Sequence, residues 1–332
     1  IKIFLTISGK LDVHNGGCGM NRRILVTGAN GFIGSRVIRK LISENDVPII
    51  LKRSGSDMSK IKNVSTELTY YDVDITPIEE IFAMEKIDAI INLATYYRKH
   101  NSYCDIVKMI ETNVEFPTKL MELCVKNEVP LFITAGSYFQ YDINSVHFNE
   151  NTPLIARDLY AATKNALQTI MDYYSSINGL TTLDLLLFTP YGEMDHEEKL
   201  IPYLIKQALR KESVKLSYGF QKLNLVYIED VAMAFVKALD VTEINTQRNL
   251  RIILANKQSY SIREIVTIVE DLLDNHIDVK WASLEMDVID RNFDLKIDTE
   301  LSDKILGWHP EIDIYEGLRR TIKYYSGDTN EH

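Results

Sequence analysis

A tyrosine and a lysine stand four positions apart at the start of an amphipathic segment, "RDLYAATKNAL" at residues 157–167. On a helix, positions i and i+4 lie on one face, so the ammonium group of Lys164 can reach the phenol of Tyr160. A nearby cation favours the ionised form of a phenol, whose ordinary pKa of about 10 is too high for ready proton exchange at neutral pH. The pair can therefore act as one acid-base device. The alternative is a half-buried tyrosine beside a solvated lysine, and other motifs must decide between the two.

A glycine-rich stretch, "VTGANGFIGS", is the second motif with chemical meaning, and it spaces Gly28, Gly31 and Gly34 three residues apart. Glycines between a strand and a helix permit a tight turn and let the backbone approach a pyrophosphate, which the helix N-terminus then binds. The motif predicts a dinucleotide site if a strand precedes it and a helix follows. The residues that we expect along the cofactor here are Gly28, Asn30, Gly31, Phe32, Ile33 and Gly34.

The elements around these motifs alternate between short apolar runs and amphipathic segments. The apolar runs are "RILVTG", "VPIILKR", "ELTYYDVD", "DAIINLA", "PLFITAG" and "TLDLLLF". Such alternation is typical of βαβ units with a parallel sheet that is buried on both faces. The sequence therefore predicts an α/β fold with a Rossmann-like, doubly wound sheet, in which the glycine turn follows the first strand.

The rhythm changes after residue 190, and this predicts a division of the chain. We expect a nucleotide-binding domain over residues 20–190, with return segments near 225–256, and a smaller, mixed substrate lobe over 191–332. Residues 1–19 precede the first patterned segment and are expected to be an extension outside the fold. A cleft between the two lobes would hold the substrate.

Composition excludes several classes of function. The 332 residues carry a formal net charge of -10 without a long basic run, which argues against nucleic acid or an anionic membrane as a partner. No apolar stretch approaches the roughly 20 residues of a membrane span, and the first residues make a poor signal peptide, so a cytoplasmic location is expected. Cys18, Cys104 and Cys124 show no metal-binding or disulfide pattern, and we expect no metal site.

Three motifs in order, "TGANGFIG", "YAATK" and "LGWHP", resemble those of the extended short-chain dehydrogenase/reductases that act on nucleotide sugars. The resemblance covers roughly residues 22–325. It implies a bound NAD or NADP, a nucleoside-diphosphate sugar as substrate, and a homodimer built by the helices that carry Asn113 and Tyr160. It also implies that Lys164 holds the nicotinamide ribose, and that a serine or threonine at the end of the fifth strand contacts the reacting oxygen.

The end of the second strand indicates which cofactor is used. An acidic residue there binds the 2'-hydroxyl of NAD, whereas an arginine accommodates the 2'-phosphate of NADP. The segment "ILKRSGSD" offers Lys52, Arg53 and Ser54, so NADP(H) is favoured; NAD(H) remains the alternative if Asp57 binds the ribose. The resemblance places further residues near the cofactor, namely Asp74, Ile75, Asn92, Leu93, Ala94, Thr95 and Asn113.

The catalytic hydroxyl is assigned by resemblance within "FITAGSYFQY". The family's serine-containing run, which ends in a tyrosine four residues later, selects Ser137, with Tyr141 as that tyrosine. Thr134 is the rival hydroxyl. Ser137, Tyr160 and Lys164 would then form the catalytic set.

The residues that follow Ser137 argue against one reaction of this family, 4,6-dehydration. The family's 4,6-dehydratases carry an Asp-Glu pair directly after the hydroxyl residue, because elimination needs a separate acid and base, and here Tyr138 and Phe139 stand there. Two reactions remain, a 4-epimerisation with tightly held NAD and an NADPH-dependent reduction of a 4-keto-6-deoxy sugar. Arg53 and several short stretches favour nucleotide-linked 4-keto-6-deoxyhexose reductases of the CDP-abequose synthase type. A non-catalytic NADP-binding regulator is a further alternative, although such proteins often lose the tyrosine or the lysine.

The substrate residues depart from the family pattern. Leu186 and Thr189 stand where the family has Arg-x-x-Asn near strand six, and Leu223 stands where it has an arginine ahead of its "FVYVDD" segment. Lys222 or Arg291 could compensate on the diphosphate. The positions that we expect to contact substrate are Tyr96, Arg98, Thr189, Lys222 and Arg291.

Overall fold

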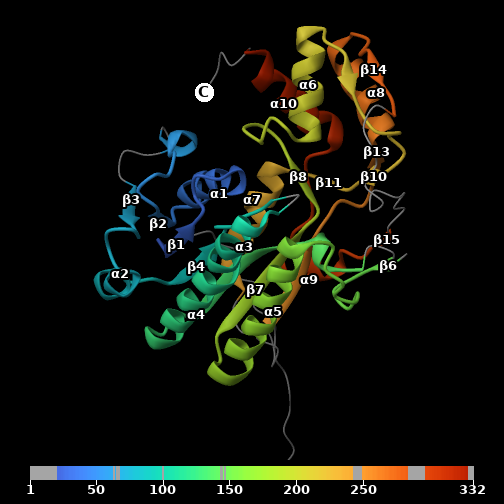
Figure 1. Cartoon of the computed structure of the whole chain (residues 1–332). Helices are drawn as coiled ribbons and strands as arrows, with labels where there is room; N and C mark the ends of the chain where they lie inside the picture. Colours follow the sequence, from blue (N-terminus) through green and yellow to red (C-terminus); the bar gives the residue numbers. More distant parts are fainter. Residues whose placement is uncertain are drawn as a thin grey trace, which may run out of the picture.

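A seven-stranded parallel sheet forms the centre of the protein (Figure 1). The computed structural model describes residues 21–62, 64, 68–98, 101–142, 145, 147–241, 249–282 and 296–327. The strand order is β12-β7-β5-β4-β1-β2-β3, so the order reverses between β1 and β4, and the predicted Rossmann-like, doubly wound sheet is confirmed. The strands are β1 (Arg23–Thr27), β2 (Val47–Lys52), β3 (Thr69–Asp72), β4 (Ala89–Asn92), β5 (Leu131–Ser137), β7 (Thr181–Leu187) and β12 (Asn249–Leu254).

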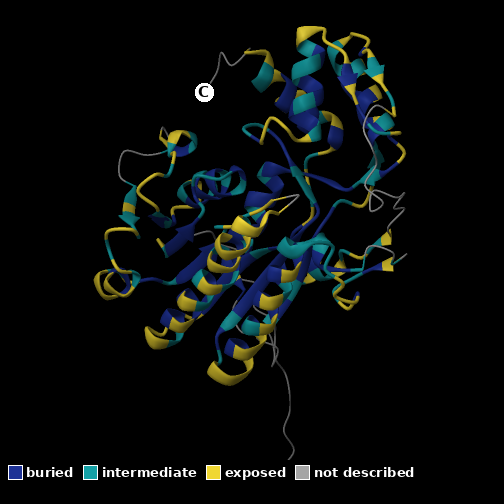
Figure 2. Cartoon of the chain, in the orientation of Figure 1, coloured by how far each residue is buried: buried dark blue, intermediate teal, exposed yellow. Residues whose placement is uncertain are grey.

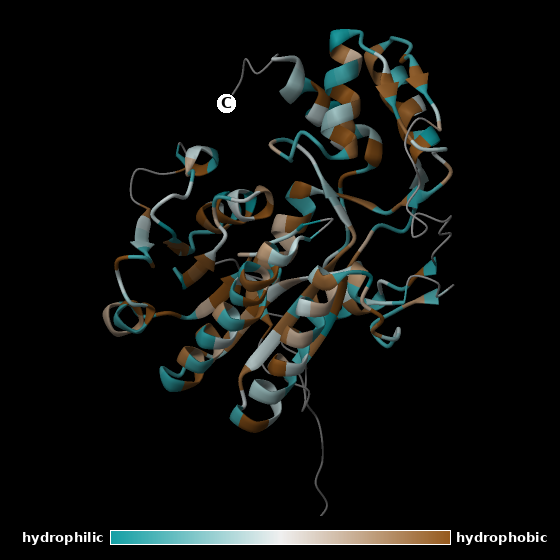
Figure 3. Cartoon of the chain, in the orientation of Figure 1, coloured by the Kyte–Doolittle hydropathy of each residue, from teal (hydrophilic) through white to brown (hydrophobic). Residues whose placement is uncertain are grey.

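Helices cover both faces of this sheet, which explains why its strands read as nearly continuous apolar runs. Leu25 of β1 packs in a cluster with residues of α2, α4 and α5, whereas its neighbours Ile24 and Val26 pack in the cluster that contains α1 and α7. Figure 2 shows the strands buried between these helices, and Figure 3 shows the same strands as mostly hydrophobic. The covering helices are α1 (Phe32–Ser43), α2 (Ile78–Met84), α4 (Phe116–Lys126), α5 (Leu159–Asn178) and α7 (Ile228–Lys237).

One helical connection differs from its expected form. The apolar periodicity of "ETNVEFPTKLM" predicts a long helix that begins at Asn113, but the helical segment begins earlier, at α3 (Tyr103–Ile110). A π-helical turn, Glu111–Glu115, joins α3 to α4. Asn113 is therefore inside a wider turn, the kind of irregularity that often occurs at functional sites.

The second lobe gathers α6 (Leu200–Arg210), α8 (Ile262–Leu273) and α10 (Ile314–Ser326) beyond the carboxyl ends of the strands (Figure 1). Its apolar helix faces belong to the same hydrophobic cluster as α1 and α7. Short strand pairs complete this lobe and its junction with the sheet. They are β8 (Thr189–Tyr191) with β11 (Leu225–Tyr227), β9 (Val214–Lys215) with β14 (Val279–Lys280), β10 (Lys222–Leu223) with β13 (Tyr260–Ser261), and β6 (His147–Phe148) with β15 (Lys296–Ile297).

The chain returns from the second lobe to the sheet before its end. The helix α7 packs against α1, and β12 pairs with β7 in parallel along its whole length. A short helix, α9 (Glu300–Leu306), lies against β12. The lobes are thus joined by several passages of the chain.

Some expectations fall on residues that the structure does not describe, namely those for residues 1–19, with Cys18 among them, and for Arg291. In the described ranges no helix has the length and apolar character needed to cross a membrane. The same ranges contain no cluster of histidine, cysteine and carboxylate side chains suited to a metal ion.

Candidate active site

The glycine turn after β1 leaves no room for side chains. Gly28 has a φ of +66°, and a Cβ atom there would lie 2.6 Å from backbone atoms of Leu93 and Ala94. A Cβ atom on Gly34 would lie 2.1 Å from the carbonyl oxygen of Gly28. The turn therefore brings β1, β4 and α1 into direct backbone contact. Gly31 caps α1, and the open N–H groups of its first turn form a cradle that fits a cofactor pyrophosphate.

The end of β2 holds three polar residues in different ways. Lys52 forms an ion pair with Asp72 at the end of β3, with 3.1 Å between Nζ and Oδ2. The hydroxyl of Ser54 donates to the same carboxylate over 2.8 Å, and the backbone N–H of Ser54 donates to Asp74 over 2.9 Å. Arg53 is exposed, and within the described ranges its guanidinium has no hydrogen bond or ion pair. Arg53 is therefore the cation at this edge that remains available for a ligand.

Asp57, the alternative ribose ligand, is engaged elsewhere. Its two carboxylate oxygens accept hydrogen bonds from the backbone N–H and the hydroxyl of Ser59, over 2.9 and 3.0 Å. These bonds hold the pKa of Asp57 below its usual value. Ile75 follows Asp74 and is 75% exposed, so it offers an open apolar surface beside the end of β3.

Hydroxyl groups connect the ends of β1, β4 and β5. Thr27 accepts hydrogen bonds from the backbone N–H groups of Leu93 and Ala94 and donates to the side chain of Asn92 over 2.7 Å. Thr134, the rival catalytic hydroxyl, is buried and donates to the carbonyl of Asn92 over 3.2 Å. Its hydroxyl is therefore part of the sheet's internal network, which argues against a catalytic role.

Asn113 fixes the loop that follows β4. Its side-chain oxygen accepts from the hydroxyl of Thr95 over 3.2 Å and from the backbone N–H of Tyr96 over 2.8 Å. Its amide nitrogen donates to the carbonyl of Tyr96 and to the hydroxyl of Thr163 on α5. The π-helical turn thereby connects the loop after β4 to the helix that carries Tyr160 and Lys164.

Tyr160 and Lys164 occupy adjacent turns of α5. Asp158 caps this helix by accepting from the backbone N–H of Ala161 over 2.8 Å. The Nζ of Lys164 lies 5.8 Å from the centre of the Tyr160 ring and donates to the carbonyl of Ala135 over 3.0 Å. Burial lowers the pKa of Lys164 to about 8.

The phenol of Tyr160 is enclosed by the loop after β4. Tyr97 packs edge-on against its ring, with 5.0 Å between ring centres. Burial raises the pKa of Tyr160, and a hydrogen bond with Thr95 opposes this effect. Burial thus outweighs the lowering that we expected from Lys164. At neutral pH the phenol is protonated, which is the form that can donate a proton.

Ser137 stands at the end of β5 and is held from both sides. Its backbone N–H donates to the side chain of Gln140 over 2.7 Å, and its hydroxyl accepts from the N–H of Phe139 over 3.3 Å. Gln140 and Asn165 exchange two hydrogen bonds, each 3.2 Å long, which join this segment to α5. The hydroxyl proton of Ser137 is consequently directed away from the backbone N–H and can be donated to a ligand.

The substrate residues expected from the sequence are spread over both lobes. Tyr96 donates to Asp105 over 2.6 Å, and Arg98 lies 3.8 Å from the same carboxylate, so both are attached to the start of α3. Thr189 is on β8, with its backbone N–H bonded to Asn224. Lys222 is on β10. Hydrogen bonds from Ser261 hold the pKa of Glu264 below its usual value, and the charge of Lys222 adds to this effect.

Two residues that support this site were not indicated by the sequence motifs, Asp72 and Gln140. Asp72 was not assigned, yet it organises Lys52 and Ser54. Gln140 is fully buried and supports Ser137. A signal for Gln140 was available, because a glutamine three residues after a serine is a capping-box pattern, and the structure contains this box.

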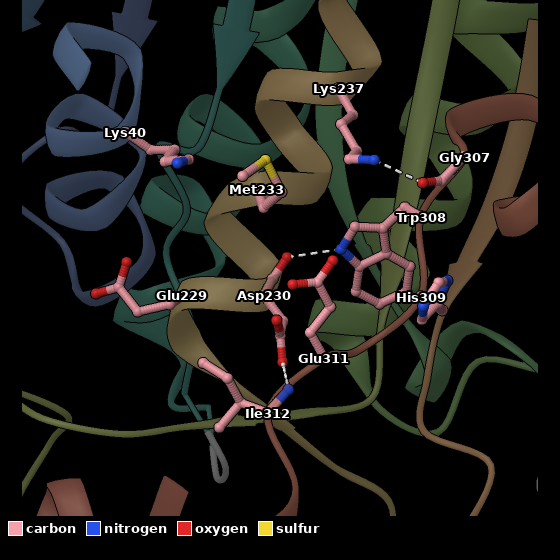
Figure 4. A pocket seen from close by; sticks show the side chains of 10 residues that line it. All are labelled: Lys40, Glu229, Asp230, Met233, Lys237, Gly307, Trp308, His309, Glu311 and Ile312. Atoms are coloured by element: carbon pink, nitrogen blue, oxygen red, sulfur yellow. Dashed lines mark hydrogen bonds between the residues drawn. The ribbon is translucent and has the colours of Figure 1, made fainter. Parts of the chain in front are cut away.

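A surface hollow lies away from this site, between α7 and the "LGWHP" segment (Figure 4). The indole N–H of Trp308 donates to the carbonyl of Asp230 over 2.8 Å, and the carboxylate of Asp230 accepts from the N–H of Ile312 over 3.0 Å. These bonds attach the C-terminal segment to α7. The third sequence motif therefore serves the junction between the lobes.

Comparison with known proteins supports the assignment made from these motifs. The chain is 26% identical to CDP-abequose synthase of Yersinia pseudotuberculosis over 261 residues, 77% of this chain and 86% of that protein. It is 27% identical to UDP-glucuronate 4-epimerase of Thermodesulfobacterium geofontis over 323 residues, 90% of this chain and 95% of that protein. The structure of UDP-glucuronic acid 4-epimerase from Bacillus cereus in complex with UDP-glucuronic acid and NAD has the same fold. Its TM-score is 0.79 at 21% identity, over 92% of this chain and 99% of that chain.

The sequence pattern of one protein family matches most of the sheet and its helices. This pattern, described as the NAD dependent epimerase/dehydratase family, covers residues 24–252. The matched range includes the glycine turn, Ser137 and the Tyr160–Lys164 pair, and it spans more than half of the chain. The protein therefore belongs to the NAD dependent epimerase/dehydratase family of enzymes.

Proposed function

We propose that this enzyme uses NADPH to reduce the C4 ketone of a nucleoside-diphosphate 4-keto-6-deoxyhexose. The observation that carries this proposal is Arg53, an exposed cation without a hydrogen-bond or ion-pair partner among the described residues, at the strand end that meets the adenosine ribose. Lys52 and Ser54 are attached to Asp72, and Asp57 is bonded to Ser59. The arrangement thus offers a cation to a 2'-phosphate.

Three residues of the chain would have separate roles in the reduction of the ketone. Hydride transfer to C4 is what a bound reduced cofactor supplies. Tyr160, protonated because of its burial, donates a proton to the ketone oxygen, and Ser137 donates a hydrogen bond to the same oxygen. Lys164 would hold the nicotinamide ribose of the bound cofactor. Donors fixed before the reaction stabilise the developing oxyanion without reorganisation.

The surroundings of Ser137 favour reduction over dehydration. Tyr138 stacks on Phe188 with 5.0 Å between ring centres and an interplanar angle of 3°. An aromatic wall therefore stands where a 4,6-dehydratase needs its acid and base. The names of relatives such as CDP-abequose synthase support a nucleotide-linked deoxysugar as substrate. The substrate contacts at Tyr96, Arg98, Thr189 and Lys222 belong to this proposal.

An NAD-dependent 4-epimerase of nucleotide sugars is the second candidate. It is favoured by the UDP-glucuronate 4-epimerase relative and by the family's own description. The third candidate, a regulator without catalysis, is disfavoured because Ser137, Tyr160 and Lys164 are all present and each is held by defined contacts.

The deciding experiment follows NADPH and NADH oxidation at about 340 nm. CDP-, dTDP- and GDP-linked 4-keto-6-deoxyhexoses serve as substrates, and NMR identifies the product. We expect turnover with NADPH on one of them. Interconversion of UDP-sugar epimers, with no net oxidation of either cofactor, would replace this proposal by the epimerase.

A further inference from the structure

An acidic residue lies in the middle of the sheet, where apolar side chains are the rule. Asp184 is 2% exposed and belongs to β7, whose other residues from Thr182 to Leu187 are also buried. A buried carboxyl group is costly unless it has hydrogen bonds or an opposite charge. Its position therefore needs a reason, and the mechanism described above does not use it.

The carboxyl group lies against the backbone that carries the catalytic serine. A Cβ atom on Gly136 would be 2.5 Å from Oδ1 of Asp184, so a glycine is needed at this point of β5. Gly136 stands between Ala135, whose carbonyl accepts the hydrogen bond of Lys164, and Ser137. Asp184 thus lies against the backbone between the residue that anchors Lys164 and the catalytic serine.

The hydrogen bonds of Asp184 are incomplete. Its Oδ2 accepts from the side chain of Gln168 on α5 over 2.6 Å. Its Oδ1 is buried and has no hydrogen-bond partner among the described residues. Gln168 stands one helical turn after Lys164, so the same face of α5 presents an amide and an ammonium group to Asp184. No hydrogen bond from the described residues offsets the negative charge on Oδ1, and the charge of Asp184 raises the pKa of Lys164.

Asp184 and Lys164 each favour the charged form of the other, whereas burial favours the neutral form of both. Burial lowers the pKa of Lys164, and the charge of Asp184 opposes that effect. Burial raises the pKa of Asp184, whereas its bond from Gln168 and the charges of Lys164 and Arg251 lower it. Burial is the largest cause of the elevated pKa of Tyr160, and the charges of Asp158, Asp184 and Tyr97 add to it.

Tyr141 completes the titratable groups near this carboxyl group. Burial raises the pKa of Tyr141, the charge of Asp184 adds to this effect, and a hydrogen bond with Gln168 opposes it. A phenol that stays protonated does not change its charge near neutral pH. Lys164 is therefore the group whose charge depends most directly on Asp184.

We propose that Asp184 is a positioning residue that keeps Lys164 in its ammonium form behind Tyr160, by placing a negative charge under the backbone of Gly136. This inference rests on the proposed function, because it assigns Asp184 a part in the same proton transfer. Asp184 touches neither substrate nor cofactor in this view. It acts through Lys164, and it favours a protonated Tyr160, the form needed for reduction.

The test is an NMR titration of protein labelled at the side-chain carbons of lysine, without cofactor or substrate. The Lys164 signal is identified by its loss in Lys164→Met. We expect a midpoint near the pKa of about 8 in the unmodified protein and a midpoint lower by about one unit in Asp184→Asn. Glu80→Gln is the matched control, because it removes an exposed carboxylate from α2, and its titration should equal that of the unmodified protein.

A midpoint unchanged by Asp184→Asn would overturn the inference, even if that variant melts at a lower temperature, because a purely structural role predicts lost stability alone. If Asp184→Asn does not fold, Gln168→Met provides the test. It removes the hydrogen bond that lowers the pKa of Asp184, and it should lower the Lys164 midpoint by a smaller amount. An unchanged midpoint in that variant contradicts the inference equally.

A second measurement separates this inference from the proposed function. The alkaline limb of the kcat profile should move to lower pH by about one unit in Asp184→Asn. Absence of turnover in the unmodified enzyme would reject the proposed function, while the lysine titration, which needs no substrate, would still decide the role of Asp184.

Discussion

The ammonium nitrogen of Lys164 lies 5.8 Å from the centre of the Tyr160 ring, one turn along the same helix. The lysine is anchored to the carbonyl of Ala135, and the tyrosine is enclosed by Tyr97. The two side chains are thus fixed from opposite sides, by β5 and by the loop after β4. Such fixation allows a proton and a ribose to be held in a constant geometry.

Replacing the phenol should remove the proton donor while leaving the site assembled. In Tyr160→Phe we expect kcat to fall by about 10²- to 10⁴-fold, with cofactor affinity little changed. Steady-state rates and cofactor fluorescence would measure the two effects. Tyr173→Phe, an exposed tyrosine of the same helix, is the control and should retain full turnover. Full turnover in Tyr160→Phe would refute the assignment of this residue.

Arg53 should determine the choice between the two cofactors. In Arg53→Ala we expect NADPH to bind roughly 10- to 100-fold more weakly, because a charge-assisted bond to the 2'-phosphate is lost, with NADH affinity unchanged. Calorimetric titration of both cofactors would measure this. Arg210→Ala, at the exposed end of α6, is the control. Equal loss for NADPH and NADH would show that Arg53 does not read the phosphate.

The glycine turn should tolerate no side chain at its first position. Gly28→Ala would force a positive φ on alanine and a clash with the backbone of Leu93. We expect a loss of unfolding free energy of at least about 1–3 kcal/mol and a loss of cofactor binding. Chemical denaturation would measure the first effect. Gly55→Ala, where a Cβ atom meets no neighbour within 4 Å, should change stability by less than about 0.5 kcal/mol.

Cofactor binding should depend on pH through Lys164. Its pKa of about 8 means that the ammonium, the form that donates to the ribose, is present below this pH and is lost above it. NADPH should therefore bind progressively more weakly as the pH rises from 7 to 9.5. In Lys164→Met, binding should be weak at every pH in this range. A parallel decline in the variant would assign the dependence to another group.

The outer faces of α3 and α5 should form a dimer interface. Tyr103 is 88% exposed, Val107 60% and Ile177 70%, an unusual amount of open apolar surface for two adjacent helices. We expect light scattering to give the mass of two chains. Val107→Glu should shift the mass toward that of one chain, because it places a charge in the apolar surface. Met84→Glu, at an exposed position of α2, should leave the mass unchanged.

The sheet was predictable because its strands are buried on both faces, and "RILVT", "AIIN" and "LRIIL" therefore carry an unmistakable apolar signal. The π-helical turn at Asn113 was not predictable, since one extra residue in a helix leaves the periodicity on each side intact. The glycine turn after the first strand was predictable because the backbone of Leu93 lies so close to Gly28 that a side chain there would clash.

The network behind the catalytic pair was harder to foresee. In "TTLDLLLF" the single aspartate interrupts an apolar run, and this was the available sign of Asp184. Its meaning depends on Gly136, which is 48 positions away in sequence and touches it only after β5 and β7 pair. Pairwise relationships of this kind arise from strand register rather than from local pattern.

The strand β12 reaches the sheet only after the chain has passed through α6 and α7. During synthesis, β7 therefore leaves the ribosome long before its second neighbour is available. An unpaired strand edge of "TTLDLLLF" would invite pairing with other chains until residue 254 has emerged. A nascent chain of this protein consequently exposes the edge of β7 until β12 pairs with it, and a chaperone bound in that interval would protect the edge beside Asp184.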